Sequence, residues 1–332
     1  MTGHPLRRRF PVVIMLFGLM VAAIVLSPLV GSTHINLWRV FDRSIPFESN
    51  VDAQIFFIAR LPRALAGALV GGTLAAAGVV FQGLLRNPLA TPYTLGVSAG
   101  ASLGAMIAIT FGATLPFAGA APASLLGAMI AVSVVYLLAT ARHNGLSTTV
   151  LLLAGVTLNS FFSALILFVQ YLANFEDLFR AMRWLMGDLD VTSYTPILGA
   201  LPFVIAAFLA FAWLARPLNL LSLGADAAGA RGVNVASMQR TAFFSASLAT
   251  GAAVSVGGPI GFVGIIVPHL ARLMVGADHR LVLPASAFLG AGFLVVCDVL
   301  ARTLMAPMEL PVGIITAMIG GPFFLWMLLR KR

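Results

Sequence analysis

Long apolar segments recur from one end of the chain to the other, and they constrain its fold more than any other feature of the sequence. A run of about 20 apolar residues is long enough to cross a lipid bilayer as a helix. Inside lipid, a segment must satisfy its own backbone hydrogen bonds, so each run is predicted to be helical. Ten such runs occur, at 11–30, 62–83, 93–112, 117–140, 147–171, 194–214, 237–257, 260–275, 281–301 and 311–329. The sequence therefore predicts an all-α, polytopic membrane protein with about ten transmembrane helices in a single domain, 1–332.

The composition fits a chain that is surrounded mostly by lipid. Of the 332 residues, 60% are hydrophobic and 9% are charged, whereas soluble domains carry about 25% charged residues. The net charge of +9 does not indicate nucleic acid, because a nucleic-acid binder clusters its basic residues and here they stand singly at the ends of apolar runs. Gly96, Gly100 and Gly104 repeat every four residues, which is typical of closely packed membrane helices.

The distribution of Lys and Arg predicts the orientation in the membrane, because cytoplasmic loops carry an excess of both. With a cytoplasmic N-terminus, seven of the 20 Lys and Arg residues fall outside and the other thirteen inside. The outer set is Arg39, Arg43, Arg60, Arg63, Arg180, Arg183 and Arg302. We therefore expect both termini inside and an even number of spans. Glycines and prolines leave the helix boundaries open between 257 and 275.

The chain carries no evident energy source of its own. Its only lysine is Lys331, so it contains no phosphate loop of the G-x-x-x-x-G-K-[ST] type. Asp298 is the one candidate for a proton relay in the membrane, but it lies one helical turn from Arg302, which favours a local ion pair. The single Cys297 and the scattered histidines predict no disulfide and no metal site, and we expect no cofactor. Two functions stay open at this point: a transport subunit driven by a separate ATPase, and an ion-coupled secondary transporter acting alone.

Two loops on the predicted inner side carry more pattern than a connector needs. The first, 86–92, contains two prolines that break helices and fix the backbone. The second, 218–235, is the longest inner loop, and we expect it to hold a short surface helix that Ser222 caps and Gly232 ends. Such a helix indicates a docking element for a cytoplasmic partner.

Arg60, Arg63 and Arg302 place positive charge on the outer side, against the usual bias. We predict that they form an exposed basic patch that attracts an acidic partner from outside. The alternative is that these side chains extend to lipid headgroups.

Taken together, these segments resemble the FecCD-type permeases, the membrane subunits of bacterial ABC importers for iron-siderophores, heme and cobalamin. The matching motifs are RLPRALAGALVGG at 60–72, RNPLATPYTLGVSAGA at 86–101, LLLAG at 151–155, LNLLSLG at 218–224, GFVGIIVPHLARLMVGADHR at 261–280 and ELPVGIITAMIGGPFF at 309–324. They follow one another from the second run to the last, so the resemblance covers nearly the whole chain.

The resemblance implies a cobalamin-importer-permease-like fold in the bacterial inner membrane. It implies a second permease subunit in a homodimer, with the transport pathway along the interface between the two copies. It also implies two cytoplasmic ABC ATPase subunits and a periplasmic or lipid-anchored substrate-binding protein. Asp188 stands where we expect Ser or Gly in many members, which leaves the choice among iron-siderophore, heme and cobalamin open.

The resemblance also implies roles for individual residues. The inner gate would consist of Asn87, Leu89, Thr148 and Thr149. The ATPase would couple to 218–235 through Asn219, Leu223, Gly224, Ala225, Ala228, Arg231 and Gly232. Arg60, Arg63 and Arg302 would meet acidic residues of the substrate-binding protein.

Overall fold

The structure is a computed structural model that describes residues 5–112, 119–141 and 147–330. The described residues form helices joined by loops and turns, with no β-strand among them. Ten helices coincide with the ten predicted runs: α1 (Pro5–Leu26), α4 (Leu61–Leu85), α5 (Val97–Phe111), α6 (Ala120–Thr140), α7 (Thr148–Leu172), α9 (Thr195–Leu221), α11 (Val235–Gly257), α12 (Val263–Val275), α13 (His279–Thr303) and α14 (Val312–Arg330). The predicted all-α fold is confirmed.

Shorter elements join these helices. They are α2 (Leu37–Val40), α3 (Val51–Gln54), α8 (Phe175–Leu185), α10 (Ala225–Gly229), the 3-10 turns η1 (Ser27–Leu29), η2 (Phe47–Ser49) and η4 (Pro92–Leu95), and a π-helical turn η3 (Ile55–Arg60). Six helical segments in the described part of the chain are long and apolar enough to cross a membrane, and one of them runs without a break through α3, η3 and α4. The protein is therefore a multi-pass membrane protein.

The boundary that the sequence left open lies at the start of α12. Gly258 and Phe262 both have φ near +66°, so the chain turns twice before the helix begins at Val263. Phe262 is an unusual residue for this left-handed conformation, and its ring rests on Gly320 of α14. A Cβ atom added to Gly320 would lie 2.4 Å from Cγ of Phe262.

Helix α4 lies at the centre of the molecule and packs against α9, α11, α12 and α13. Small residues allow these helices to approach at the level of the backbone. A Cβ atom on Gly71 would lie 2.3 Å from the carbonyl oxygen of Gly290 in α13, and one on Gly78 would lie 2.1 Å from that of Gly264 in α12. Glycine is therefore required at both levels of α4.

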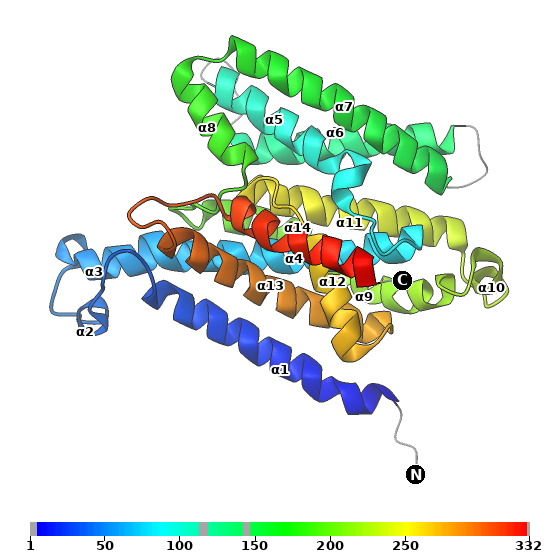
Figure 1. Cartoon of the computed structure of the whole chain (residues 1–332), viewed down its shortest axis with the longest axis horizontal. Coiled ribbons are helices and arrows are strands. Elements are labelled where there is room, and N and C mark those ends of the chain that lie inside the picture. The colour runs from blue at the N-terminus through cyan, green and yellow to red at the C-terminus, as the bar shows by residue number, and fades with distance from the viewer. Residues whose placement is uncertain (1–4, 113–118, 142–146, 331–332) are drawn as a thin grey trace.

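A second group of helices, α5 to α8, packs on the α11 side of this centre, while α1 packs on α13 at the opposite side (Figure 1). Gly100 and Gly104 of α5 face Gly127 and Ala123 of α6 so closely that added Cβ atoms would lie 2.6 Å or less from backbone oxygens. The close packing predicted for this glycine repeat is confirmed for these two positions, whereas Gly96 has φ +78° and precedes α5.

The molecule has two distinct ends (Figure 1). We call one the α8 end, where α2, α3 and α8 lie, and the other the α10 end, where α10 lies together with the first turn of α1 and the last turn of α14. Both ends of the described chain therefore lie on the side of α10.

Candidate transport, docking and coupling sites

A buried group of charges lies at the α8 end. Arg63 of α4 donates from Nε to Oδ1 of Asp298 at 2.7 Å and from Nη1 to Oε2 of Glu309 at 2.5 Å. Arg302 lies 3.0 Å from the other oxygen of Asp298, although this contact lacks hydrogen-bond alignment. The predicted ion pair between Asp298 and Arg302 is confirmed. Asp298 is fully buried between two guanidinium groups, which compensates the burial of its charge.

Arg60 and Arg302 also donate hydrogen bonds to backbone carbonyl groups of the segment that follows α1. Arg60 donates to the carbonyl oxygens of Pro28, at 3.0 Å, and Thr33. Arg302 donates to the carbonyl oxygen of Val30 at 3.2 Å and to the hydroxyl of Ser27 at 3.0 Å. These contacts hold the connection between α1 and α2 over the start of α4.

The expected exposure of the three arginines is not observed. Arg60, Arg63 and Arg302 are only 4–5% exposed, because carbonyls and carboxylates surround them. They line a cavity of about 200 Å³ together with Asp190 and Glu309. The side chains of Asp190 and Glu309 are 49% and 39% exposed, so the surface that a partner would meet is not simply basic. Whether these arginines contact a binding protein stays a prediction.

Ion pairs connect this charged group to α8. Arg183 of α8 lies 2.6 Å from Asp188 and 3.4 Å from Asp190, and Asp190 lies 4.0 Å from Arg63. Partial burial opposes the charge of Arg183, but the two carboxylates outweigh it and raise the pKa of this guanidinium. Asp188, where the sequence resemblance led us to expect Ser or Gly, is therefore part of a chain of charges that reaches Asp298.

The loop 86–92 is a compact turn at the α10 end of α4. Arg86 has φ +48° and ends the helix, and the side-chain oxygen of Asn87 accepts a hydrogen bond from the N–H of Leu89 at 3.0 Å. Leu89 and Thr149 are both exposed, and the side chain of Thr148 lies outside the described residues. The convergence of the four predicted gate residues stays a prediction.

The segment after this turn is attached to α7. Asn159 of α7 donates to the carbonyl oxygen of Tyr93 at 3.4 Å. Gly155, the last residue of the LLLAG motif, lies against the backbone of η4, since a Cβ atom there would be 2.5 Å from the carbonyl oxygen of Thr94. This glycine therefore permits direct contact between α7 and the turn.

The predicted coupling segment contains the expected short helix, α10, but its cap differs from the prediction. Helix α9 continues to Leu221, and the hydroxyl of Ser222 donates back to the carbonyl oxygen of Asn219 at 2.7 Å, so Ser222 does not cap α10. The N-cap residue is Gly224, with φ +116°. Gly232, with φ +81°, follows the end of α10 as expected.

The residues of this segment divide into two groups. Leu223, Arg231 and Gly232 are exposed, whereas Ala228 is fully buried. Asn219 faces the start of α13, where its Nδ2 donates to Asp278 at 2.6 Å and its Oδ1 accepts from the N–H of His279 at 2.9 Å. Asn219 and Ala228 thus hold the segment to its own chain, while the exposed residues are available to a partner.

A model of the FecCD transport family matches residues 19–330. The chain belongs to this family. It is 38% identical to the hemin transport system permease protein HmuU of Yersinia pestis, over 96% of each chain. It is 45% identical to the cobalamin import system permease protein BtuC of Halobacterium salinarum, over 82% of this chain and 72% of that one. A metal-chelate type ABC transporter solved in an inward-facing conformation superposes with a TM-score of 0.84 at 33% identity, covering 96% of this chain and 99% of that one.

The chain is therefore a permease subunit of an ABC transporter. The main feature that sequence reasoning missed is the contact of Arg63 with Asp298 and Glu309, which are 235 and 246 residues away along the chain. A signal was present, since a buried carboxylate with one local arginine still has a second oxygen that requires a partner.

Proposed function

We propose that the complex of this permease is a bacterial importer that moves an iron chelate (iron-siderophore or heme) or cobalamin across the inner membrane. The observation that carries the proposal is an exposed short helix, α10, in a FecCD-family chain that has no phosphate loop. The energy is proposed to come from a separate ATPase, and α10 with its flanking turns is an exposed element that can receive it. The relatives named for hemin and cobalamin support the substrate class.

The α10 end is proposed to face the cytoplasm, with both termini there. The excess of Lys and Arg in the loops assigned to that side supports this orientation. The α8 end then faces the periplasm, where a substrate-binding protein delivers the substrate.

Two copies of the chain are proposed to form a homodimer with the pathway between them and a gate at Asn87, Leu89, Thr148 and Thr149. Helix α7 supports this arrangement, because most of its surface is not covered within one chain. Its contacts with η4 through Gly155 and Asn159 mean that a movement of α7 would carry the 86–92 turn with it.

The substrate-binding protein is proposed to dock over the cavity of Arg60, Arg63 and Arg302. Asp190 and Glu309 at its rim already interact with Arg63, so an incoming carboxylate would compete with them. Arg60 is bonded only to carbonyl oxygens and forms no ion pair with a described residue, which makes it the most available of the three.

The test of the function is reconstitution. The permease, its ATPase and its binding protein are placed in liposomes and offered hemin, a ferric siderophore and cobalamin in parallel. We expect uptake of one class that requires ATP and is unaffected by ion gradients. Uptake by the permease alone, driven by a proton or sodium gradient, would contradict the proposal and favour a secondary transporter.

The role of the coupling segment is tested by Ala225→Trp, which fills the surface beside Gly224 without changing its φ. We expect substrate-stimulated ATP hydrolysis to fall at least tenfold while the complex still inserts. Val51→Trp, an exposed site at the α8 end, is the control and is expected to hydrolyse ATP as the wild type does. Undiminished stimulation in Ala225→Trp would exclude this contact.

A further inference from the structure

A groove of about 400 Å³ lies between α9 and α13 towards the α10 end. Its apolar lining consists of Phe208, Phe211, Ala212 and Ala215 of α9, Leu283, Pro284, Ala287 and Phe288 of α13, and Ala76 of α4. Along α13 the lining reaches from His279 to Phe288, a rise of nine residues that corresponds to about 14 Å of helix. Phe288 also packs edge-on against Phe17 of α1, with ring centroids 5.2 Å apart. The groove is long and narrow enough to hold a hydrocarbon chain.

The end of this groove at the α10 side is basic. Arg280 lines it, is exposed, and forms no ion pair with a described residue. Arg216 lies one helical turn beyond Ala212 on the opposite wall and is likewise exposed and without an ion pair in the described part of the chain. The neighbouring carboxylate, Asp278, caps α13: its Oδ1 accepts from Asn219 at 2.6 Å and from the N–H of Arg280 at 3.0 Å, and it forms no ion pair with a described residue. Two guanidinium groups are therefore available for an anion.

A proline in each of the two helices leaves a backbone carbonyl group without its usual helical donor. Pro284 has no N–H to donate to the carbonyl oxygen of Arg280, four residues earlier in α13. Pro217 stands in the same relation to Trp213 in α9. The basic end of the groove thus offers donors to an anion and carbonyl acceptors to hydroxyl groups.

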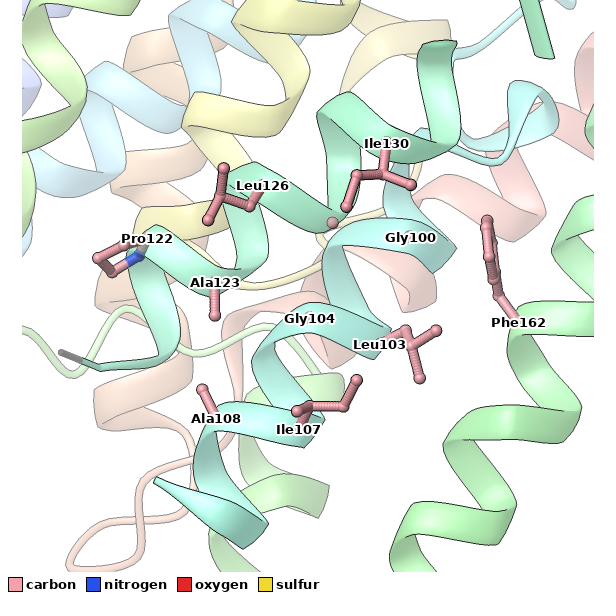
Figure 2. A pocket seen from close by; sticks show the side chains of 11 residues that line it. Gly100, Leu103, Gly104, Ile107, Ala108, Pro122, Ala123, Leu126, Ile130 and Phe162 are labelled. Atoms are coloured by element: carbon pink, nitrogen blue, oxygen red, sulfur yellow. The ribbon is translucent and has the colours of Figure 1, made fainter. Parts of the chain in front are cut away.

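A second groove of about 400 Å³ is equally apolar but has no basic end. It lies between α5 and α6, with Phe162 of α7 facing it (Figure 2). Glycine, alanine, leucine and isoleucine residues form most of its wall, and none of the described residues that line it is charged. It can accept an apolar chain, but it offers nothing to a charged headgroup.

We propose that the groove between α9 and α13 binds an anionic phospholipid with a hydroxylated headgroup. One acyl chain lies between the two helices, and the phosphate is bound by Arg216 and Arg280. The headgroup hydroxyls donate to the carbonyl oxygens of Trp213 and Arg280. Basic pockets between transmembrane helices on the cytoplasmic side are suited to anionic lipids.

The test measures lipid binding to the purified full-length permease in detergent, by native mass spectrometry and by titration with phosphatidylglycerol and phosphatidylcholine of equal chain length. We expect selective binding of phosphatidylglycerol. In Arg216→Gln/Arg280→Gln its affinity should fall on the order of thirtyfold, which corresponds to the contribution of two basic residues near a membrane surface. Arg240→Gln, which removes an exposed arginine from α11, is the matched control and should bind as the wild type does.

Two further measurements separate the sources of binding. Ala212→Trp fills the groove and should abolish retention of phosphatidylglycerol while leaving both arginines in place. Glycerol phosphate at millimolar concentration should not displace the lipid, because the acyl chain contributes to its binding. Equal binding of the two lipids by the wild type, or undiminished binding by the double variant, would overturn the proposal. Displacement by glycerol phosphate would overturn it as well, because it would reduce the site to an anion site.

Discussion

The two ends of α4 are held in place by different kinds of contact. At the α8 end, Arg63 binds Asp298 and Glu309 through charged hydrogen bonds. Towards the α10 end, α4 meets its neighbours through close backbone contact at Gly78 and through an amide hydrogen bond from Gln82 to the carbonyl oxygen of Gly264 at 3.2 Å. One end depends on matched charges, and the other depends on the absence of side chains.

The difference has consequences for what each end tolerates. Removing one partner of a buried ion pair destabilises the fold, since the remaining charge is uncompensated. A larger side chain at a close helix contact destabilises the fold, because the two helices must move apart. The α8 end should therefore be sensitive to loss of charge, and the α10 end to gain of size.

The largest effect is expected for Arg63→Met. The change leaves Asp298 buried with only the poorly aligned contact to Arg302, and breaking such a pair destabilises by about 3–5 kcal/mol. The measurement is the midpoint of thermal unfolding of the purified protein in detergent, with size-exclusion chromatography as the readout of the folded fraction. Arg63→Met/Asp298→Leu should recover only part of the loss, because it removes the uncompensated carboxylate but leaves Arg302 with its contacts to Val30 and Ser27 alone. A single variant as stable as the wild type would contradict the role of this pair.

The next effect concerns volume at the other end. In Gly78→Ala the new methyl group would lie 2.1 Å from the carbonyl oxygen of Gly264, so α4 and α12 must separate, at a cost of about 1–3 kcal/mol. Gly199→Ala in α9 is the matched control, since nothing lies within 4 Å of a Cβ atom there. The same thermal assay should place the control at or above the wild type. Equal midpoints for the two variants would refute the claim of close contact.

A smaller effect is expected where α9 meets α13. Asn219→Ala removes the hydrogen bonds to Asp278 and to the N–H of His279, a loss of about 1 kcal/mol. Ser222→Ala removes one exposed hydroxyl nearby and should be neutral within about 0.5 kcal/mol. If the two substitutions lower the thermal midpoint equally, Asn219 does not join the helices.

The smallest effect is expected for Asp188→Ser, which removes the 2.6 Å contact with Arg183. Arg183 is 44% exposed in its side chain, so solvent screens this pair and the change in stability should lie within about 0–1 kcal/mol. Hydrogen exchange of α8 amides should increase in the variant, while amides of α4 should not change. Equal protection of α8 in both proteins would show that this ion pair does not hold the helix.

Much of the fold could be predicted because lipid forces each long apolar run to become a helix. The pair of Asp298 and Arg302 could also be predicted, since residues four apart lie on one helix face. The burial of Arg60 could not, because the carbonyl groups of Pro28 and Thr33 that bind it belong to a loop whose path no local pattern fixes. Ser222 was assigned the wrong role because α9 continues through Pro217, a residue that normally disfavours a helix interior.

The contact of Phe262 with Gly320 has a mechanical consequence. The ring of Phe262 occupies the space of a missing side chain on α14, and the left-handed backbone of Phe262 fixes the direction in which the ring points. Gly320 lies between Ile319 and Gly321 in α14, and successive residues of a helix are displaced by about 1.5 Å. A shift of α14 that brought Ile319 to the position of Gly320 would place a branched side chain where the ring of Phe262 lies. The contact of Phe262 with Gly320 therefore favours one relative position of α12 and α14.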